Sequence, residues 1–166
     1  KILGVTISRR FSVKPHVAAC AQTLYALRTL RHHGLGLHSN SIQAIFQATV
    51  VAKLAYATPA WVGFANAADR ARLEAFLRRS ASFKYRSTSS PNFARICDEA
   101  DKNLFRNILC NTAYLLHPLL PPLRDSHYNL RDRSHPHQLP ARTTALRDCN
   151  FIMRMLYRNV GTSTAL

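Results

Sequence analysis

Acidic residues are scarce in this chain of 166 residues, which has 8 Asp and Glu against 23 Lys and Arg and a formal net charge of +15. Such an excess of positive charge repels itself unless an anionic partner offsets it, and nucleic acids are the commonest partners of this kind. An acidic membrane surface and a merely solvated basic surface are the alternatives. Residues 1–97 hold 14 of the cations and only two acids, Asp69 and Glu74. We therefore expect the anion-binding surface in this part of the chain.

Motifs of common enzymes are also lacking. The chain has no G-x-S-x-G, no G-x-x-x-x-G-K-[ST], no G-x-G-x-x-G and no H-E-x-x-H. Asp98, Glu99 and Asp101 form the tightest acidic group, but their neighbouring helix positions point in different directions, unlike the paired carboxylates of a two-metal site. We interpret them as the solvated start of a helix, which the helix dipole favours. No catalytic residue is predicted.

Cysteine pairs and zinc patterns are absent as well. The four cysteines are widely spaced without a C-x-x-C, which suits a reducing, intracellular compartment. Cys110 lies in an apolar helical segment, where burial would make its thiol inert. Four histidines of the Pro-rich segment match no zinc spacing, so no metal ligand is predicted there: His117, His127, His135 and His137.

No long apolar run suggests a membrane partner. The longest apolar stretch, residues 50–68, contains Lys53, Pro59 and Asn66, and a membrane-spanning helix needs about 20 predominantly apolar residues. Apolar residues recur instead at helical spacing in three segments, predicted as helices over 17–33, 39–57 and 67–83. Gly34 and Pro59 would end the first two. On the third helix we expect Leu73, Phe76, Leu77 and Phe83 to face inward.

The predicted fold class is mainly α, with five regions. Residues 1–10 form a short N-terminal β-strand that needs partners to pair its backbone, and residues 11–86 form the three-helix bundle. Residues 87–116 form further helices after a break near residues 89–91. Residues 117–146 hold five of the eight prolines and form an extended connector. Residues 147–166 form a C-terminal helix and tail.

Basic residues on these helices are predicted to line a groove that follows a sugar–phosphate backbone. Taken singly, each is better explained as a solvated surface charge, whereas the groove is favoured for the residues taken together. Arg72, Arg79 and Arg86 recur every seven residues, on one side of the third helix. The aromatic rings of Tyr56 and Trp61 would either stack on bases or plug the core. The predicted nucleic-acid-binding residues are Lys14, Arg28, Arg31, Lys53, Arg72, Arg78, Arg79, Lys84 and Arg86.

Four segments in this order resemble the region after the catalytic palm in reverse transcriptases of non-LTR (LINE-type, jockey-like) retrotransposons. They are "KILGVTIS", "TLYALRTLRHHGL", "LAYATPAWVGF" and "DRARLEAFLRRS". The resemblance covers residues 1–86 and continues more weakly to "NFIMRMLY" at residues 150–157. It implies that Leu3, Gly4 and Val5 belong to the primer grip, and that the helices form the thumb that clamps a template–primer duplex. The family helix is about one turn longer between His16 and Leu24.

The resemblance also implies partners and location. The missing neighbours of the first strand would be palm strands of the same polypeptide, together with its fingers, acting in the cytoplasm and nucleus. The metal-binding aspartates and their Mg²⁺ would lie outside this segment, which alone is expected to be inactive. The alternative hypothesis is a stand-alone, domesticated helical scaffold. Its apolar surface, around residues 2–7 and 151–156, would recruit a protein partner.

Overall fold

The structure is a computed structural model that describes residues 14–32, 39–124 and 135–158. It confirms a mainly α-helical protein. Among the described residues the only β-pairing is an isolated antiparallel bridge between Leu123 and His137, and the predicted strand at residues 1–10 lies outside them. The chain divides into two compact units, residues 1–100 and 101–166, here called the first and the second unit.

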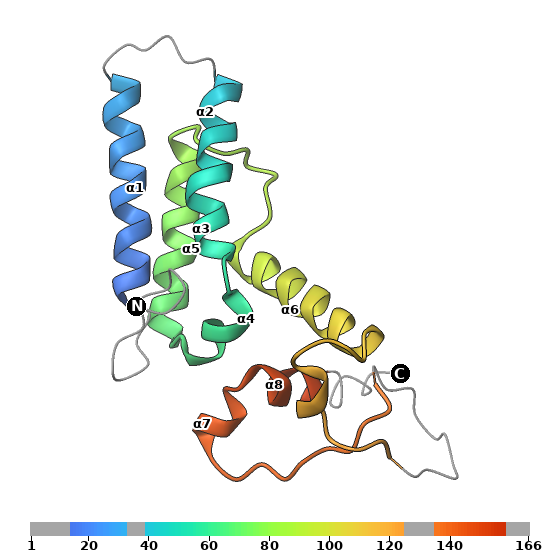
Figure 1. Ribbon diagram of the computed structural model, residues 1–166. Coiled ribbons are helices and arrows are strands. Elements are labelled where there is room, and N and C mark those ends of the chain that lie inside the picture. Colours follow the sequence, from blue (N-terminus) through green and yellow to red (C-terminus); the bar gives the residue numbers. More distant parts are fainter. Residues whose placement is uncertain (1–13, 33–38, 125–134, 159–166) are drawn as a thin grey trace, which may run out of the picture. The chain divides into compact units, whose positions relative to one another are not determined.

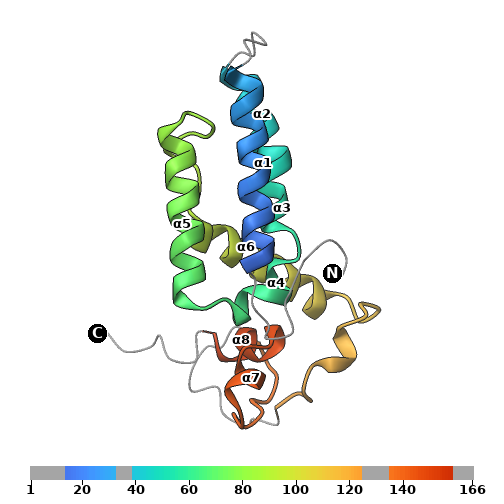
Figure 2. The ribbon, with the colours of Figure 1, turned by 90° about the vertical axis from the view of Figure 1, so that its left-hand side faces the viewer.

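Three helical segments of the first unit lie side by side (Figures 1 and 2). The segments are α1 (Lys14–His32), the consecutive turns α2 (Ser39–Phe46), η1 (Gln47–Val51) and α3 (Ala52–Ala55), and α5 (Ala67–Ser82). The α2–α3 segment runs antiparallel to α1, and α5 runs parallel to α1. Helix α1 contacts η1, α3 and α5.

The middle segment contains a π-helical turn, η1. A π turn holds one residue more than an α turn, so it shifts the buried face of the helix. The shift brings the adjacent residues Val50 and Val51 into the core together, between Phe46 and Leu54. The sequence pattern predicts a helix apolar around most of its circumference, and the π turn explains how two neighbours can both be buried.

The same segment ends earlier than predicted. We expected the helix to continue over residues 39–57 until Pro59, but α3 ends at Ala55, and Ala57 adopts a left-handed conformation with φ of 51°. The hydroxyl of Thr58 donates to the carbonyl of Ala55. Pro59 instead lies in the first turn of the short helix α4 (Thr58–Trp61), where a proline loses no helical hydrogen bond.

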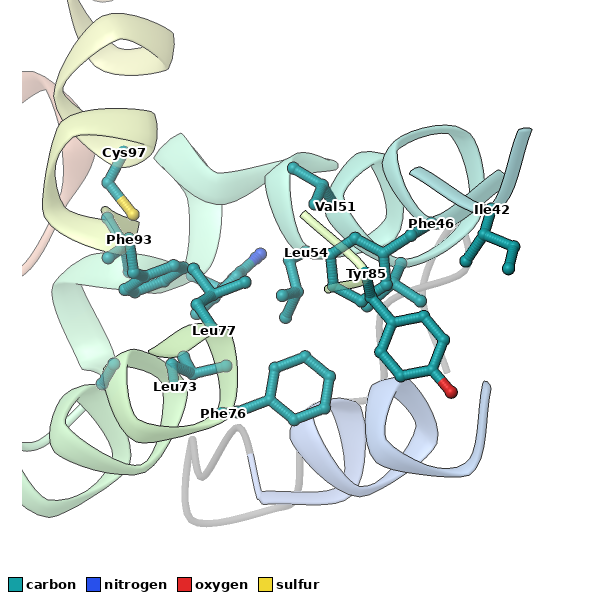
Figure 3. Packing of buried hydrophobic residues seen from close by; sticks show 14 residues of the cluster. Ile42, Phe46, Val51, Leu54, Leu73, Phe76, Leu77, Tyr85, Phe93 and Cys97 are labelled. Carbon is teal, nitrogen blue, oxygen red and sulfur yellow. The ribbon is translucent and has the colours of Figure 1, made fainter. Parts of the chain in front are cut away.

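Among the residues that the structure describes, fourteen buried ones form the core of the first unit (Figure 3). Trp61 is fully buried, so the interpretation of this ring as a core plug is confirmed. It stacks on Phe93 with 5.9 Å between ring centroids, and Phe46 stacks on Tyr85 at 6.2 Å. Stacked aromatic rings of this kind add to the stabilisation from apolar burial.

Helix α6 (Phe93–Cys110) begins in the first unit and is tied to α5 there. The Oε1 atom of Glu74 accepts a hydrogen bond at 3.0 Å from the backbone N–H of Ala94. The side chain of Asn92 caps the same turn, accepting from the N–H of Arg95 at 2.9 Å. A carboxylate is favoured at a helix N-terminus, because the unpaired N–H groups there carry partial positive charge.

The second unit holds residues 101–110 of α6, the turn η3 (His117–Leu119) and the short helices α7 (Ala145–Asp148) and α8 (Phe151–Tyr157). Its core contains Phe105, Ile108, Phe151, Met155 and Leu156. The described part of the Pro-rich segment is irregular backbone apart from η3, the isolated bridge and the first two residues of α7.

Polar groups are buried in the second unit. Asp101 is only 4% exposed and binds Arg154 through two contacts, at 2.7 and 3.4 Å. Our interpretation of residues 98–101 as a solvated helix start is therefore wrong for Asp101, which lies in the middle of α6. Glu99 is exposed and pairs with Arg95 at 3.0 Å.

Two buried histidines join the Pro-rich segment to the end of α8. The Nδ1 atom of His135 accepts from the backbone N–H of His137 at 3.2 Å. Its Nε2 atom therefore carries the proton and donates to the carbonyl of Leu156 at 2.8 Å. His137 Nδ1 bonds the carbonyl of Pro121 at 2.7 Å. Both histidines are therefore held by backbone atoms.

Candidate nucleic-acid interface

Helix α5 presents three arginines at its surface. Arg72 and Arg79 are two turns apart on one flank, and Arg78 lies opposite the buried residues Leu73 and Leu77. All three arginines are exposed. Arg72 approaches Asp69 at 3.9 Å, and an exposed pair of this length contributes little to stability. Arg70 of α5 is exposed as well, but its side chain donates to the carbonyls of Val62 at 2.9 Å and Ala65 at 3.2 Å, so it supports the backbone that precedes α5.

Helix α1 presents a second basic surface. Lys14 and Arg28 are fourteen residues apart, so they share a face and lie about 21 Å apart along the helix axis. Both are exposed. Tyr25 shares this face and is 72% exposed. Arg31 lies in α1, but its side chain is outside the described part of the structure.

One arginine of each surface, Arg28 and Arg79, lines a cavity of about 240 Å³ between α1 and the C-terminal half of α5. The guanidinium carbon of Arg28 lies 5.5 Å from the centre of the Phe83 ring, within the range of a cation–π interaction. Arg79 faces the same cavity. The lining consists of Ala21, Tyr25, Arg28, Phe76, Arg79, Phe83 and Tyr85.

The cavity is aromatic and positively charged. Within the described parts of the chain, no carboxylate pairs with Arg28 or Arg79. The Nε atom of Arg79 donates to the carbonyl of Ala75 at 3.3 Å. A guanidinium has five N–H donors, so most of the donors of both arginines remain available to an anion.

Lys84 follows α5 in a left-handed conformation with φ of 61°. The N–H of Tyr85 donates to the carbonyl of Ser80 at 3.0 Å, and the N–H of Lys84 donates to that of Ala81 at 2.9 Å. These two bonds form a Schellman motif, in which the left-handed position is usually glycine. A lysine there is conformationally costly, and it places a cation between Phe83 and Tyr85, two residues of the cavity lining.

Arg86 requires a correction. We predicted it on the same side of the third helix as Arg72 and Arg79, but α5 ends at Ser82 and the Schellman turn reverses the chain. Arg86 is 8% exposed and donates to the carbonyl of Pro91 at 2.6 Å. Burial lowers its pKa, and the nearby charge of Glu74 acts in the opposite direction. The structure assigns Arg86 to the support of the loop between α5 and α6.

The remaining predicted residues are not brought into the cavity. Lys53 is half-buried in α3 and is not among the lining residues. Tyr56, three residues later, is half exposed. The predicted primer-grip residues Leu3, Gly4 and Val5 lie outside the described residues.

The four aromatic residues of the cavity were not predicted as site residues, and two of them, Tyr25 and Phe83, are exposed. Tyr25 precedes Arg28 by three residues, and Phe83 follows Arg79 by four, so each ring is a helical neighbour of a predicted arginine. That spacing is a signal which could have identified both. Phe83 was expected to face inward, yet it is 49% exposed, because it stands at the C-cap of α5 where the helix leaves the core.

The described part of the chain was also expected to lack metal ligands, a reactive thiol and a membrane span. No group of three or more His, Cys, Asp or Glu there could hold a metal ion. Cys110 is exposed, contrary to the expected burial, and Cys97 is buried. None of the described helices combines the length and apolar character required to cross a membrane.

Comparisons of the chain with known protein families, with curated proteins and with solved structures find no match. The role of the cavity and of its neighbouring cations is therefore inferred from their chemistry and geometry.

Proposed function

We propose that residues 14–86 act as the thumb region of a retrotransposon reverse transcriptase, an RNA-directed DNA polymerase, and grip a template–primer duplex. One observation carries this proposal: Arg28 of α1 and Arg79 of α5 line one aromatic cavity, and the described carboxylates do not neutralise either arginine. The order of the segments that resemble this family supports it, as does the scarcity of acids in residues 1–97.

In this proposal the segment binds and does not catalyse. Lys14 and Arg28 would contact phosphates from α1, and Arg72, Arg78 and Arg79 would contact them from α5. Contacts to phosphate hold a duplex in register without reading its sequence. The bond-forming chemistry would belong to a palm domain of the same polypeptide.

The alternative, a scaffold that recruits a protein through apolar surface, has less support. The residues of α8 that would form half of that surface, Phe151 and Leu156, pack in the core of the second unit. They are not exposed for a partner. The other half, residues 2–7, lies outside the described residues.

The test is a titration of a fluorescently labelled RNA–DNA hybrid with the full chain at several salt concentrations, followed by anisotropy. We compare the wild type with a triple variant of α5, Arg72→Glu, Arg78→Glu and Arg79→Glu. We expect the variant to lose at least tenfold in affinity and to lower the slope of log K against log salt by about three, since each lost phosphate contact removes about one unit.

A matched control carries the same change of charge in the second unit: Lys102→Glu, Arg106→Glu and Arg147→Glu. All three of these residues are exposed. The control should retain the salt slope of the wild type. Equal losses in the two triple variants would mean that net charge alone drives binding, and would contradict the assigned surface. Failure of the wild type to bind the hybrid would contradict the function.

A further inference from the structure

We propose that the cavity between α1 and α5 binds one unpaired nucleotide of a nucleic-acid strand. Its base would lie against Tyr25 and Phe83, and its phosphate would be bound by Arg28 and Arg79. This inference rests on the proposed function and deepens it, because it names a ligand that is distinct from the duplex backbone.

The size of the cavity fits a ligand as small as one nucleotide base. Its volume is about 240 Å³, whereas pockets for drug-sized molecules measure about 300–1,000 Å³. Phe76 and Tyr85 are almost completely buried and form a rigid part of the lining (Figure 3). The stack of Tyr85 on Phe46 fixes the position of its ring.

The exposed rings indicate a flat apolar partner. Tyr25 is 72% exposed and Phe83 is 49% exposed, although both line the cavity beside the buried rings of Phe76 and Tyr85. The ring of Tyr25 is therefore in contact with water over most of its surface, and stacking on aromatic side chains is the usual way in which proteins bind unpaired bases. Burial of this ring by a base would be favourable.

The two arginines indicate an anion beside that flat partner. The cation–π contact with Phe83 holds the guanidinium of Arg28 at the edge of the cavity, and Arg79 approaches from α5. Guanidinium groups bind phosphate oxygens through paired N–H donors. Rings and guanidinium groups at one small site match the two parts of a nucleotide.

An unpaired nucleotide fits this site better than a duplex or an acidic peptide. Inside a duplex, each base face is already covered by its stacked neighbours, and only the outer face of a terminal pair is free, so the rings could not reach an internal base. An acidic peptide would satisfy the arginines but would leave the two rings in water. An unpaired nucleotide offers both a free ring face and a phosphate.

The test compares two labelled ligands in anisotropy titrations of the full chain: a blunt RNA–DNA hybrid, and the same hybrid with a single-stranded extension. We expect the extension to increase the affinity. Tyr25→Ala should remove the gain, which we expect to be about 5- to 150-fold for one stacked base, and should weaken binding of the blunt hybrid much less. Tyr25→Phe keeps the ring and should retain the gain.

These variants are suitable because Tyr25 lies at the surface and alanine is the best helix former, so α1 is expected to remain folded. Arg79→Ala should weaken binding of the extended hybrid and lower its salt slope by about one. Lys102→Ala, on α6 and outside the cavity, is the matched control and should leave both titrations unchanged.

Several outcomes would overturn the inference and leave the proposed function in place. One is equal affinity of the wild type for the blunt and the extended hybrid. Another is an equal loss for both ligands in Tyr25→Ala. A poly-glutamate peptide that displaces the extension, or free AMP that binds as tightly as the extended strand, would assign the cavity to a different ligand. Conversely, Tyr25-dependent binding of a single strand without binding of the blunt hybrid would support the cavity and refute the duplex grip.

Discussion

The two units use their charged residues in different ways. In the second unit, Asp101 and Arg154 bind each other in a largely buried pair at 2.7 Å. In the first unit, Arg28 and Arg79 remain at the rim of an open cavity, and the described residues offer them no carboxylate. A buried arginine that is paired with a carboxylate belongs to the fold of its unit. An arginine that lines a cavity and has no carboxylate partner is available to bind an anion.

This difference shows why net charge alone does not locate a binding surface. Cations exceed acids in both units, by 14 to 4 in residues 1–100 and by 9 to 4 in residues 101–166. What separates individual arginines is burial and pairing. Arg86 belongs to the first unit, yet it is buried and supports the backbone, so it resembles Arg154 more closely than it resembles Arg79.

The largest effect is expected from breaking the buried pair of the second unit. Asp101→Ala leaves the guanidinium of Arg154 without its carboxylate, and removal of one partner of a buried pair typically costs about 3–5 kcal/mol. Hydrogen exchange of the α8 amides should accelerate strongly, because these amides report the second unit. Trp61, the single tryptophan, is buried in the first unit, so its fluorescence transition in urea should change little.

The matched control for Asp101→Ala is Glu99→Ala, which breaks the exposed pair with Arg95 on the same helix. It should change the stability by less than about 1 kcal/mol. Equal acceleration of exchange in the two variants would contradict the stabilising role of the buried pair. A large shift of the Trp61 transition in Asp101→Ala would show instead that the two units unfold together.

Helices of the first unit could be predicted because their apolar spacing is regular. The third predicted helix, residues 67–83, agrees with α5 to within one residue. The end of the second helix could not be predicted as well. The residue in the left-handed conformation is Ala57, and an alanine does not indicate this conformation in a sequence. Pro59 is a strong signal for the end of a helix, so the end was predicted next to it, two residues beyond the observed one.

The ion pair of the second unit could not be predicted, for a different reason. Asp101 and Arg154 are 53 residues apart, and nothing in the local pattern of either residue indicates the other. For Arg86 the seven-residue spacing was misleading, because that count is meaningful only while the helix continues. The Schellman turn after Ser82 ends it, and the residue in the left-handed position is a lysine rather than the glycine that would have signalled the turn.

An intermediate effect on stability is expected at Arg86, the buried arginine of the first unit. Arg86→Ala removes the donor to the carbonyl of Pro91 and leaves a small void, so we expect a loss of about 1–3 kcal/mol in the free energy of unfolding. Urea titration followed by Trp61 fluorescence measures this loss. Burial lowers the pKa of Arg86, which means that its charge is disfavoured there, so Arg86→Met should cost less than Arg86→Ala.

The control for Arg86→Ala is Arg72→Ala, at an exposed position of α5. It should change the free energy of unfolding by no more than about 0.5 kcal/mol and should weaken nucleic-acid binding instead. If neither alanine variant lowered the free energy of unfolding, Arg86 would have no structural role. The distinction between structural and binding arginines in the first unit would then be wrong.

The smallest effect is expected at Lys84, where stability and binding should change in opposite directions. Lys84→Gly removes the cost of a left-handed lysine with φ of 61°, so the free energy of unfolding should rise by about 1 kcal/mol. The same change removes a cation beside the cavity, so the salt slope of duplex binding should fall by about one. Urea midpoints and anisotropy titrations measure the two effects.

Ala57→Gly separates these two effects, because Ala57 is left-handed as well, with φ of 51°, but carries no charge. It should raise the stability of the first unit by a similar amount and leave binding unchanged. If Lys84→Gly stabilised the fold without weakening binding, the lysine would be a conformational cost without a binding role. A loss of binding in Lys84→Gly alone would mean that the strain is retained for the sake of the charge, which is the pattern expected of a functional site.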